Sequence, residues 1–142
     1  MSSFKWSDCP VIIPYYGGKY QLSKVLVPMI PEHKRYIEVF AGGLSMFFRK
    51  KRVEKNIVND FDNDIVNLYV SVAEKFDEFS NHIYWIPRSR KLFEDYQSEI
   101  LSTKDKIEMP DAKRAAMYYY VIKNAFNKNP YNVLSKAEGR KT

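Results

Sequence analysis

The first part of the chain alternates short apolar runs with amphipathic helical patterns. Apolar runs rich in isoleucine, valine and phenylalanine at 36–40 and 56–59 predict two buried strands. Apolar residues at helical spacing predict helices from about Lys19 to Pro31, over 44–51 and over 65–72. A strand followed by a helix, repeated along the chain, is typical of an α/β fold.

The pattern becomes helical after about residue 75. Apolar residues at helical spacing predict helices over 76–86 and 89–102, and a third that starts after an Asp111 cap and runs to about Phe126. The tail from Asn127 is polar, basic and rich in turn residues. We therefore expect two parts, an α/β part over 1–74 and a helical part over 75–142.

The predicted sheet is too small to be complete. Beyond the two clear strands only a weaker run at 11–13 could form a third, whereas a parallel α/β layer has several strands with both faces covered. The chain is thus expected to form the front part of a larger domain, with an incomplete Rossmann-like sheet.

The stretch 35–45 is the centre of this pattern. It predicts a strand, a tight turn at Gly42 and Gly43, and the start of a helix near Ser45, which either caps that helix or lies in its first turn. Such a turn places a nucleotide-like ligand at the carboxyl end of a strand. It is not the G-x-G-x-x-G dinucleotide pattern, because the third glycine is missing.

Composition narrows the class of protein. The net charge of +6 and the pI near 9.3 suit a polyanionic partner, although many basic proteins bind none. The only cysteine is Cys9, and His33 and His82 lie far apart, so neither a disulfide framework nor a metal site is expected. The sequence shows no signal-peptide core and no apolar run of membrane-spanning length, so we expect a cytoplasmic protein.

Several residues suggest a binding site. Tyr15 offers an aromatic face and Lys19 a cation, and Asp60 ends the second strand about 20 residues beyond the Gly42 turn. A carboxylate there can accept hydrogen bonds from ribose hydroxyls, a lysine can pair with a ligand carboxylate, and Phe61 could pack on a purine. These groups fit S-adenosylmethionine, and no P-loop motif indicates ATP or GTP.

Each of these features also has a plainer interpretation. Tyr15 alone is more simply a core aromatic, a glycine pair is more often a turn, and Asp60 alone is more often a helix cap. The basic run 49–52 is better explained as a solvated helix face than as a DNA contact. Lys136, Arg140 and Lys141 could equally track phosphates or belong to a disordered tail. The order and spacing of the motifs together favour the binding site.

Three strings resemble the N-terminal motifs of Dam-type DNA adenine methyltransferases. They are Tyr15-Tyr-Gly-Gly-Lys19, Phe40-Ala-Gly-Gly-Leu-Ser45 and Asn59-Asp60-x-x-x-Asp64-x-x-Asn67-Leu68-Tyr69. The resemblance implies that Tyr15, Lys19 and Asp60 contact S-adenosylmethionine, while the turn formed by Phe40, Gly42 and Gly43 shapes the pocket. It also implies adenine N6-methylation of DNA, a role of the kind found in restriction–modification systems.

The resemblance further implies that the helical region after about 75 recognises double-stranded DNA. The residues at the start of that family's DNA-reading segment would be Lys123, Asn124, Asn127 and Lys128. The family's catalytic motif, Asp-Pro-Pro-Tyr, does not occur in the sequence, and Asn129-Pro130-Tyr131 is one proline short. We interpret this tripeptide as a turn, so no catalytic residue is predicted.

We therefore expect an N-terminal fragment of a DNA adenine N6-methyltransferase, inactive alone, whose incomplete sheet favours self-association or a partner chain. Two alternatives remain open at this point. The chain could be a non-catalytic module that binds S-adenosylmethionine or DNA, or a structural protein that oligomerises through its sheet edge.

Overall fold

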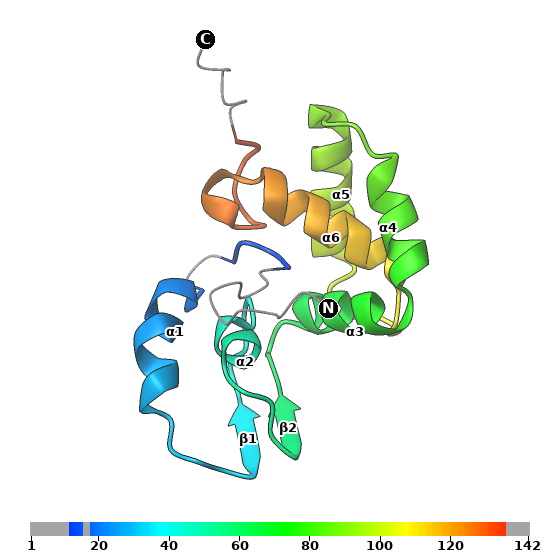
Figure 1. The fold of residues 1–142 in the computed structure, drawn as a ribbon. Helices are drawn as coiled ribbons and strands as arrows, with labels where there is room; N and C mark the ends of the chain where they lie inside the picture. The colour runs from blue at the N-terminus through cyan, green and yellow to red at the C-terminus, as the bar shows by residue number, and fades with distance from the viewer. Residues whose placement is uncertain (1–11, 16–17, 136–142) are drawn as a thin grey trace. The chain divides into compact units, whose positions relative to one another are not determined.

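The computed structural model describes residues 12–15 and 18–135 of the 142-residue chain (Figure 1). The chain divides into two compact units, one ending at Phe61 and one beginning at Asp62. This boundary separates two groups of residues that pack among themselves. The division into a cofactor-binding part over 1–74 and a DNA-binding part over 75–142 stays a prediction.

The first unit is built on two parallel strands, β1 (Arg35–Glu38) and β2 (Lys55–Val58), in which Ile37 lies opposite Ile57. Its helices are α1 (Tyr20–Leu26), continued by the 3₁₀ turn η1 (Val27–Met29), and α2 (Ser45–Arg49). Mixed helices and a small parallel sheet agree with the predicted α/β class. Within the described residues the sheet has no third strand, since 12–13 form a bend and Val11 lies outside them.

The two faces of this sheet differ in what covers them. Tyr36 and Glu38 point to one face, where Lys50 at the end of α2 lies over the Tyr36 ring, 4.2 Å from its centroid. Ile37 and Ile57 share the other face and are 62% and 43% exposed. The prediction of a buried strand is therefore wrong for the Ile37 face, because the described part of the unit provides one covering layer where parallel sheets normally have two.

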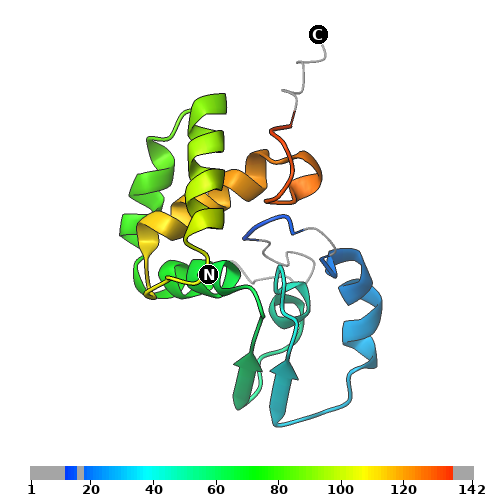
Figure 2. The same ribbon diagram turned by 180° about the vertical axis from the view of Figure 1, so that it is seen from behind.

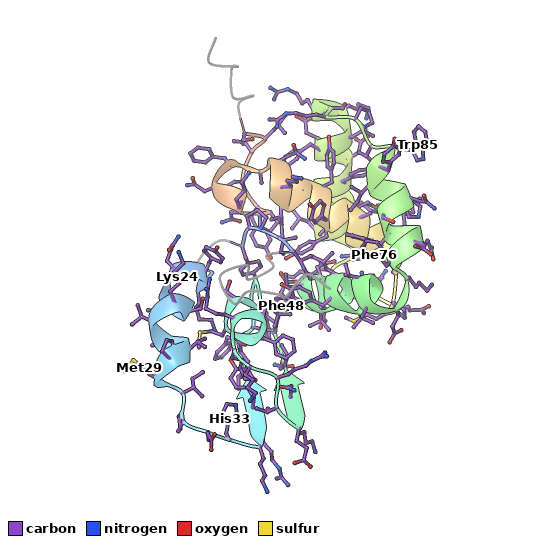
Figure 3. All side chains as sticks on the ribbon, viewed as in Figure 1. Lys24, Met29, His33, Phe48, Phe76 and Trp85 are labelled. Carbon is purple, nitrogen blue, oxygen red and sulfur yellow. The ribbon has the colours of Figure 1, made fainter. Side chains whose placement is uncertain are left out.

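Apolar exposure continues beyond the strands. The side chains of Val39 and Phe40, just after β1, are also exposed, and Met29 projects from the end of the α1 segment (Figure 3). The helix predicted from the apolar spacing in α1 is confirmed, yet the side chains of Leu22 and Val25 are more than half exposed. This unit thus presents more apolar surface than an isolated soluble domain usually does.

The basic run after the glycine turn is only partly solvated. Lys50 is buried, and its Nζ donates to the carbonyl of Lys51 at 2.9 Å and to Oδ1 of Asn56 at 3.1 Å. Arg49 donates from Nε to the Ser23 hydroxyl at 2.8 Å. The expected solvated face is therefore wrong for Arg49 and Lys50, because α2 is one turn long and their aliphatic stems pack inward. Lys51 and Arg52 are exposed as predicted.

Burial changes the pKa of Lys50. It lowers the pKa of this lysine from its ordinary value, and the nearby Glu38 carboxylate partly opposes that shift. Lys50 is thus held by a hydrogen-bond network and a ring face, and it contributes to the interior of the first unit.

Up to residue 135, the second unit consists of helices, their connections and one isolated antiparallel bridge between Ala125 and Leu134, and α6 (Ala112–Asn124) packs against three other helices (Figure 2). These are α3 (Asn63–Glu74), α4 (Phe76–Tyr84) and α5 (Arg90–Ser102), and the 3₁₀ turn η2 (Phe126–Lys128) follows α6. The predicted helices are confirmed. Ala115, Ala116, Val121 and Ile122 of α6 are buried, as its apolar spacing indicates, whereas Tyr119 in the same predicted set is only half-buried.

The start of each of three helices follows from a side-chain cap. Asp62 accepts from the amide of Asp64, Ser89 from that of Leu92 and Asp111 from that of Arg114. These short polar side chains satisfy amides that have no partner within their helix. The predicted cap at Asp111 is confirmed.

A buried ion pair links α3 to α6. Arg114 donates from Nε and Nη2 to the two carboxylate oxygens of Asp64 at 2.7 and 3.1 Å, and from Nη2 to the Ile100 carbonyl at 3.0 Å. Asn67 exchanges two 2.9 Å hydrogen bonds with the backbone of Asp111. Two residues of the third motif, Asp64 and Asn67, therefore anchor helices of the second unit.

Candidate functional site

The glycine turn at the end of β1 is tight, as the sequence predicts. Gly42 has φ +50°, and the amide of Leu44 donates to the Ala41 carbonyl at 2.9 Å. A Cβ on Gly42 would lie 3.2 Å from Cδ1 of Tyr15. Glycine is thus needed both for the backbone conformation and for the close approach of the Tyr15 ring.

Asp60 is brought to this turn from the end of β2. Its Oδ2 accepts a 2.7 Å hydrogen bond from the amide of Gly42, and the Ala41 amide donates to the Asn59 carbonyl at 3.0 Å. The parallel strands place both segments at the same edge of the sheet, which is where open α/β sheets bind ligands. The sequence-predicted residues Tyr15, Gly42 and Asp60 therefore meet.

Lys19 lies at the same end of β1. Its Nζ donates to Oε1 of Glu38 at 3.0 Å and to the carbonyl of Phe40 at 2.9 Å. Glu38 is buried and also accepts from the Tyr36 hydroxyl at 3.0 Å. Burial, and secondarily the Glu38 carboxylate, hold the pKa of Tyr36 well above its usual range, so this phenol stays a hydrogen-bond donor.

Sequence reasoning missed Glu38. The available signal was a charged residue inside an otherwise apolar run, at the position that alternation turns toward the covered face. Of the other predicted residues, Gly43 is buried in the turn, whereas Phe40 and Phe61 have side chains 73% and 90% exposed.

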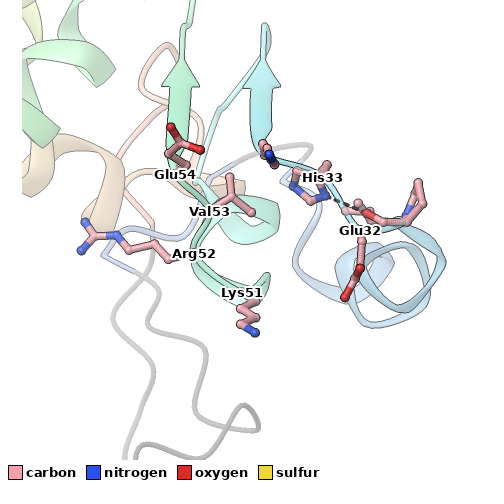
Figure 4. Close-up of a pocket in the computed structure, with 9 residues that line it drawn as sticks. Glu32, His33, Lys51, Arg52, Val53 and Glu54 are labelled. Carbon is pink, nitrogen blue, oxygen red and sulfur yellow. Dashed lines mark hydrogen bonds between the residues drawn. The ribbon is translucent and has the colours of Figure 1, made fainter.

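A groove of about 520 Å³ lies at the opposite end of the strands (Figure 4). The segments that precede β1 and β2 line it, with Glu32 and His33 from one and Lys51, Arg52 and Glu54 from the other. Its charges are mixed and it lies at the amino ends of the strands. It is therefore distinct from the predicted ligand edge.

The predicted DNA-contacting residues gather at the C-terminal end of α6. Lys123 and Asn127 are exposed, and Nζ of Lys128 donates to the Lys123 carbonyl at 2.8 Å. Asn124 is fully engaged within the protein, because its Nδ2 donates to the Tyr120 carbonyl at 2.8 Å and its Oδ1 accepts from Nη1 of Arg88 at 3.2 Å. Sequence reasoning did not single out Arg88, which no motif marks.

The remaining predictions concern metal sites, the basic residues near the C-terminus and membrane-spanning segments. Within 12–15 and 18–135, no three His, Cys, Asp or Glu side chains gather as a metal site would require, and Cys9 lies outside these residues. Lys136, Arg140 and Lys141 also lie outside the described residues. In that same part of the chain, no helix has both the length and the apolar character needed to span a membrane.

The small parallel sheet and the helices around it are consistent with a methyltransferase-like α/β fold. Residues 15–138 match the family model of the D12 class N6 adenine-specific DNA methyltransferase, and the chain belongs to this family. The predicted resemblance is therefore confirmed.

Three curated relatives are methyltransferases by name, and the name of one of them specifies DNA adenine. The chain is 26% identical to the DNA N-6-adenine-methyltransferase of Escherichia phage P1 over 96% of its own length and 14% of that protein. It is 28% identical to Type II methyltransferase M1.LlaDCHI of Lactococcus lactis subsp. cremoris over 82% of the chain and 44% of the relative. It is 26% identical to Type II methyltransferase M.MjaIII of Methanocaldococcus jannaschii over 82% of the chain and 38% of the relative. The chain spans less than half the length of each of these relatives.

Proposed function

We propose that the chain provides the S-adenosylmethionine-binding part and a DNA-contacting part of a DNA adenine N6-methyltransferase. The observation that carries this proposal is the 2.7 Å hydrogen bond from the Gly42 amide to Asp60 at the carboxyl ends of two parallel strands. It unites the second and third family motifs at the edge where such sheets bind ligands. Family membership supports the reaction class.

The residues at this edge fit the cofactor by their chemistry. The Asp60 carboxylate can accept from the ribose hydroxyls, and the aromatic face of Tyr15 suits the adenine. Lys19 can pair with the methionine carboxylate, and its two bonds to β1, to Glu38 and to the Phe40 carbonyl, keep the ammonium at this end of the strand. The bound cofactor would supply the methyl group as a sulfonium, while these residues bind and orient it.

Replacing Asp60 with alanine is expected to weaken S-adenosylmethionine binding by roughly tenfold to a hundredfold. A charge-assisted hydrogen bond is typically worth about 1.5–3 kcal/mol, and calorimetry measures the loss directly. Asp60→Asn separates the cofactor role from the turn, because the amide oxygen can still accept from Gly42 but carries no charge. Asp105→Ala, at an exposed acid between α5 and α6, is the control. Unchanged affinity in folded Asp60 variants would remove this residue from the site.

Lys19→Ala is expected to weaken cofactor binding in the same direction, through loss of the pair with the methionine carboxylate. The matched control is Lys24→Ala, which removes the same charge from an exposed position on α1. Because Lys19 also neutralises buried Glu38, the Lys19→Ala/Glu38→Gln double variant should fold better than Lys19→Ala yet bind the cofactor equally weakly. Recovery of affinity in the double variant would assign Lys19 a structural role only.

The open sheet face supports a second part of the proposal, that this chain associates with itself or with a partner polypeptide. Ile37 and Ile57 leave one face uncovered, and in the described residues β1 and β2 pair only with each other. We expect light scattering to show self-association, and Ile37→Lys/Ile57→Lys to reduce it. The control is Val133→Lys, on an exposed apolar residue of the second unit. A monodisperse monomer of the unaltered chain would contradict this expectation.

A further inference from the structure

A small pocket in the helical unit combines two cations with no carboxylate. It has a volume of about 220 Å³ and lies between the end of α4 and the second half of α6. Arg88 and Lys123 line it, and its other residues are two isoleucines, two tyrosines and Asn124. Two unopposed cations beside aromatic rings favour an anionic ligand.

Arg88 is held in one orientation by the protein. Its Nη1 donates to Asn124 Oδ1 at 3.2 Å, and its Nη2 donates to the carbonyl and the hydroxyl of Ser135 at 2.7 and 3.3 Å. A guanidinium has five N–H donors, so at least two remain for a ligand. The side chain is exposed and forms no ion pair with any residue that the structure describes.

The negative end of the α6 dipole would normally oppose an anion here, but its carbonyls are capped. Lys128 Nζ donates to the Lys123 carbonyl, and the Ser135 amide donates to the Asn124 carbonyl, both at 2.8 Å. The Asn124 side-chain amide covers the Tyr120 carbonyl. The carbonyls of Lys123 and Asn124, the last two residues of the helix, are therefore satisfied by the protein, and Lys128 adds a compensating positive charge.

We propose that Arg88, with Lys123 beside it, binds a phosphate of the DNA backbone, and that Asn124 is a positioning residue for Arg88. Each polar end of the Asn124 side chain makes a hydrogen bond within the protein, and the bond from Arg88 to its oxygen orients the guanidinium. The inference rests on the proposed function, because it takes DNA as the ligand of this region, and it assigns the contact to a residue outside every family motif identified in the sequence.

The test is the salt dependence of binding of the full chain to a fluorescein-labelled duplex of mixed sequence, followed by anisotropy. Each phosphate contact contributes about 0.9 to the slope of log affinity against log salt. Arg88→Gln should lower the slope by about that amount and weaken binding similarly for unrelated sequences. Arg90→Gln removes an equal charge two residues away, where Arg90 faces Glu94 at 4.0 Å, and should change the slope much less. An equal slope for Arg88→Gln and the unaltered chain would overturn the proposal.

A double-mutant cycle separates positioning from direct contact. Asn124→Ala should weaken binding, but in the Arg88→Gln background it should have little further effect, because the two residues act as a unit. Fully additive losses would assign Asn124 its own DNA contact. Circular dichroism checks that the variants fold. No binding by the unaltered chain even at about 50 mM salt would contradict the DNA part of the proposed function as well, whereas binding that is indifferent to Arg88 overturns this inference alone.

Discussion

Replacing Arg114 with methionine is expected to destabilise the helical unit by about 3–5 kcal/mol. The substitution leaves the Asp64 carboxylate, whose side chain is 1% exposed, without its cation. It also removes the donors to Thr103 and to the Ile100 carbonyl. A buried charge without a partner costs far more than the pair contributes, so removing one member has a large effect.

Urea unfolding followed by circular dichroism measures this loss. The control is Arg90→Met, at an exposed pair with Glu94 on α5, where the change should be within about 1 kcal/mol. Asp64→Leu combined with Arg114→Met should recover much of the stability, since a hydrophobic pair leaves no buried charge. If Arg114→Met alone unfolds at the same urea concentration as the unaltered chain, the ion pair has no structural importance.

The stability deficit of Arg114→Met should also depend on pH. Burial raises the pKa of Asp64 above its ordinary value even though Arg114 opposes the shift, and loss of Arg114 raises it further. A carboxyl whose folded-state pKa is raised binds its proton more tightly in the folded state. Stability of the variant therefore recovers as pH falls through that raised pKa and declines again as pH rises through it. A deficit equal at acidic and neutral pH would contradict this assignment.

The helical unit could be predicted well because its signals are local. Caps at Asp62 and Asp111 act within three residues, and the apolar spacing of α6 matches its buried face. The Asp64–Arg114 pair joins residues 50 positions apart, and nothing in the local pattern pairs them. Asp64 was noticed as part of a motif, but its partner was not.

The first unit was harder to predict, because the burial of its side chains depends on which segments cover the sheet. The apolar runs correctly predicted the strands, yet they also indicated burial of Ile37, whose face has no covering layer among the described residues of this unit. Lys50 was predicted to face solvent because lysine side chains are usually exposed. Its ammonium instead contacts the ring of Tyr36 and the amide oxygen of Asn56, and the sequence pattern does not reveal these partners. Of the site, Asp60 and Gly42 followed from motif spacing, whereas Glu38 and Arg88 carried no motif.

The third motif spans the boundary between the two units and contributes to both. Asp60 bonds to the glycine turn of the first unit, while Asp64 and Asn67 bond to α6 and its cap in the second. Sequence reasoning treated the motif mainly as a cofactor contact. Its later residues instead bond to α6, whose last turn carries Lys123.

A polypeptide of these 142 residues is expected to transfer no methyl group to DNA. Transfer requires the adenine amine to be held by polar acceptors in line with the methyl group. The resemblance assigns those acceptors to an Asp-Pro-Pro-Tyr loop, and the sequence contains no such string. The nearest substitute, Asn129-Pro130-Tyr131, is tied into the helical unit. Gln97 donates to the Pro130 carbonyl at 2.7 Å, Lys104 donates to the Tyr131 hydroxyl at 2.8 Å, and Asn129 Oδ1 accepts from the Tyr131 amide at 3.0 Å.

The assay uses tritiated S-adenosylmethionine and duplex DNA of mixed sequence, with the DNA N-6-adenine-methyltransferase of Escherichia phage P1 as the positive control. We expect label in DNA from the relative and none from the 142-residue chain, even where calorimetry shows that the chain binds the cofactor. Steady incorporation by the chain would contradict the prediction. Asn129→Ala would then show whether this tripeptide supplies the acceptor, because loss of that activity with retained cofactor binding would identify it as the catalytic loop.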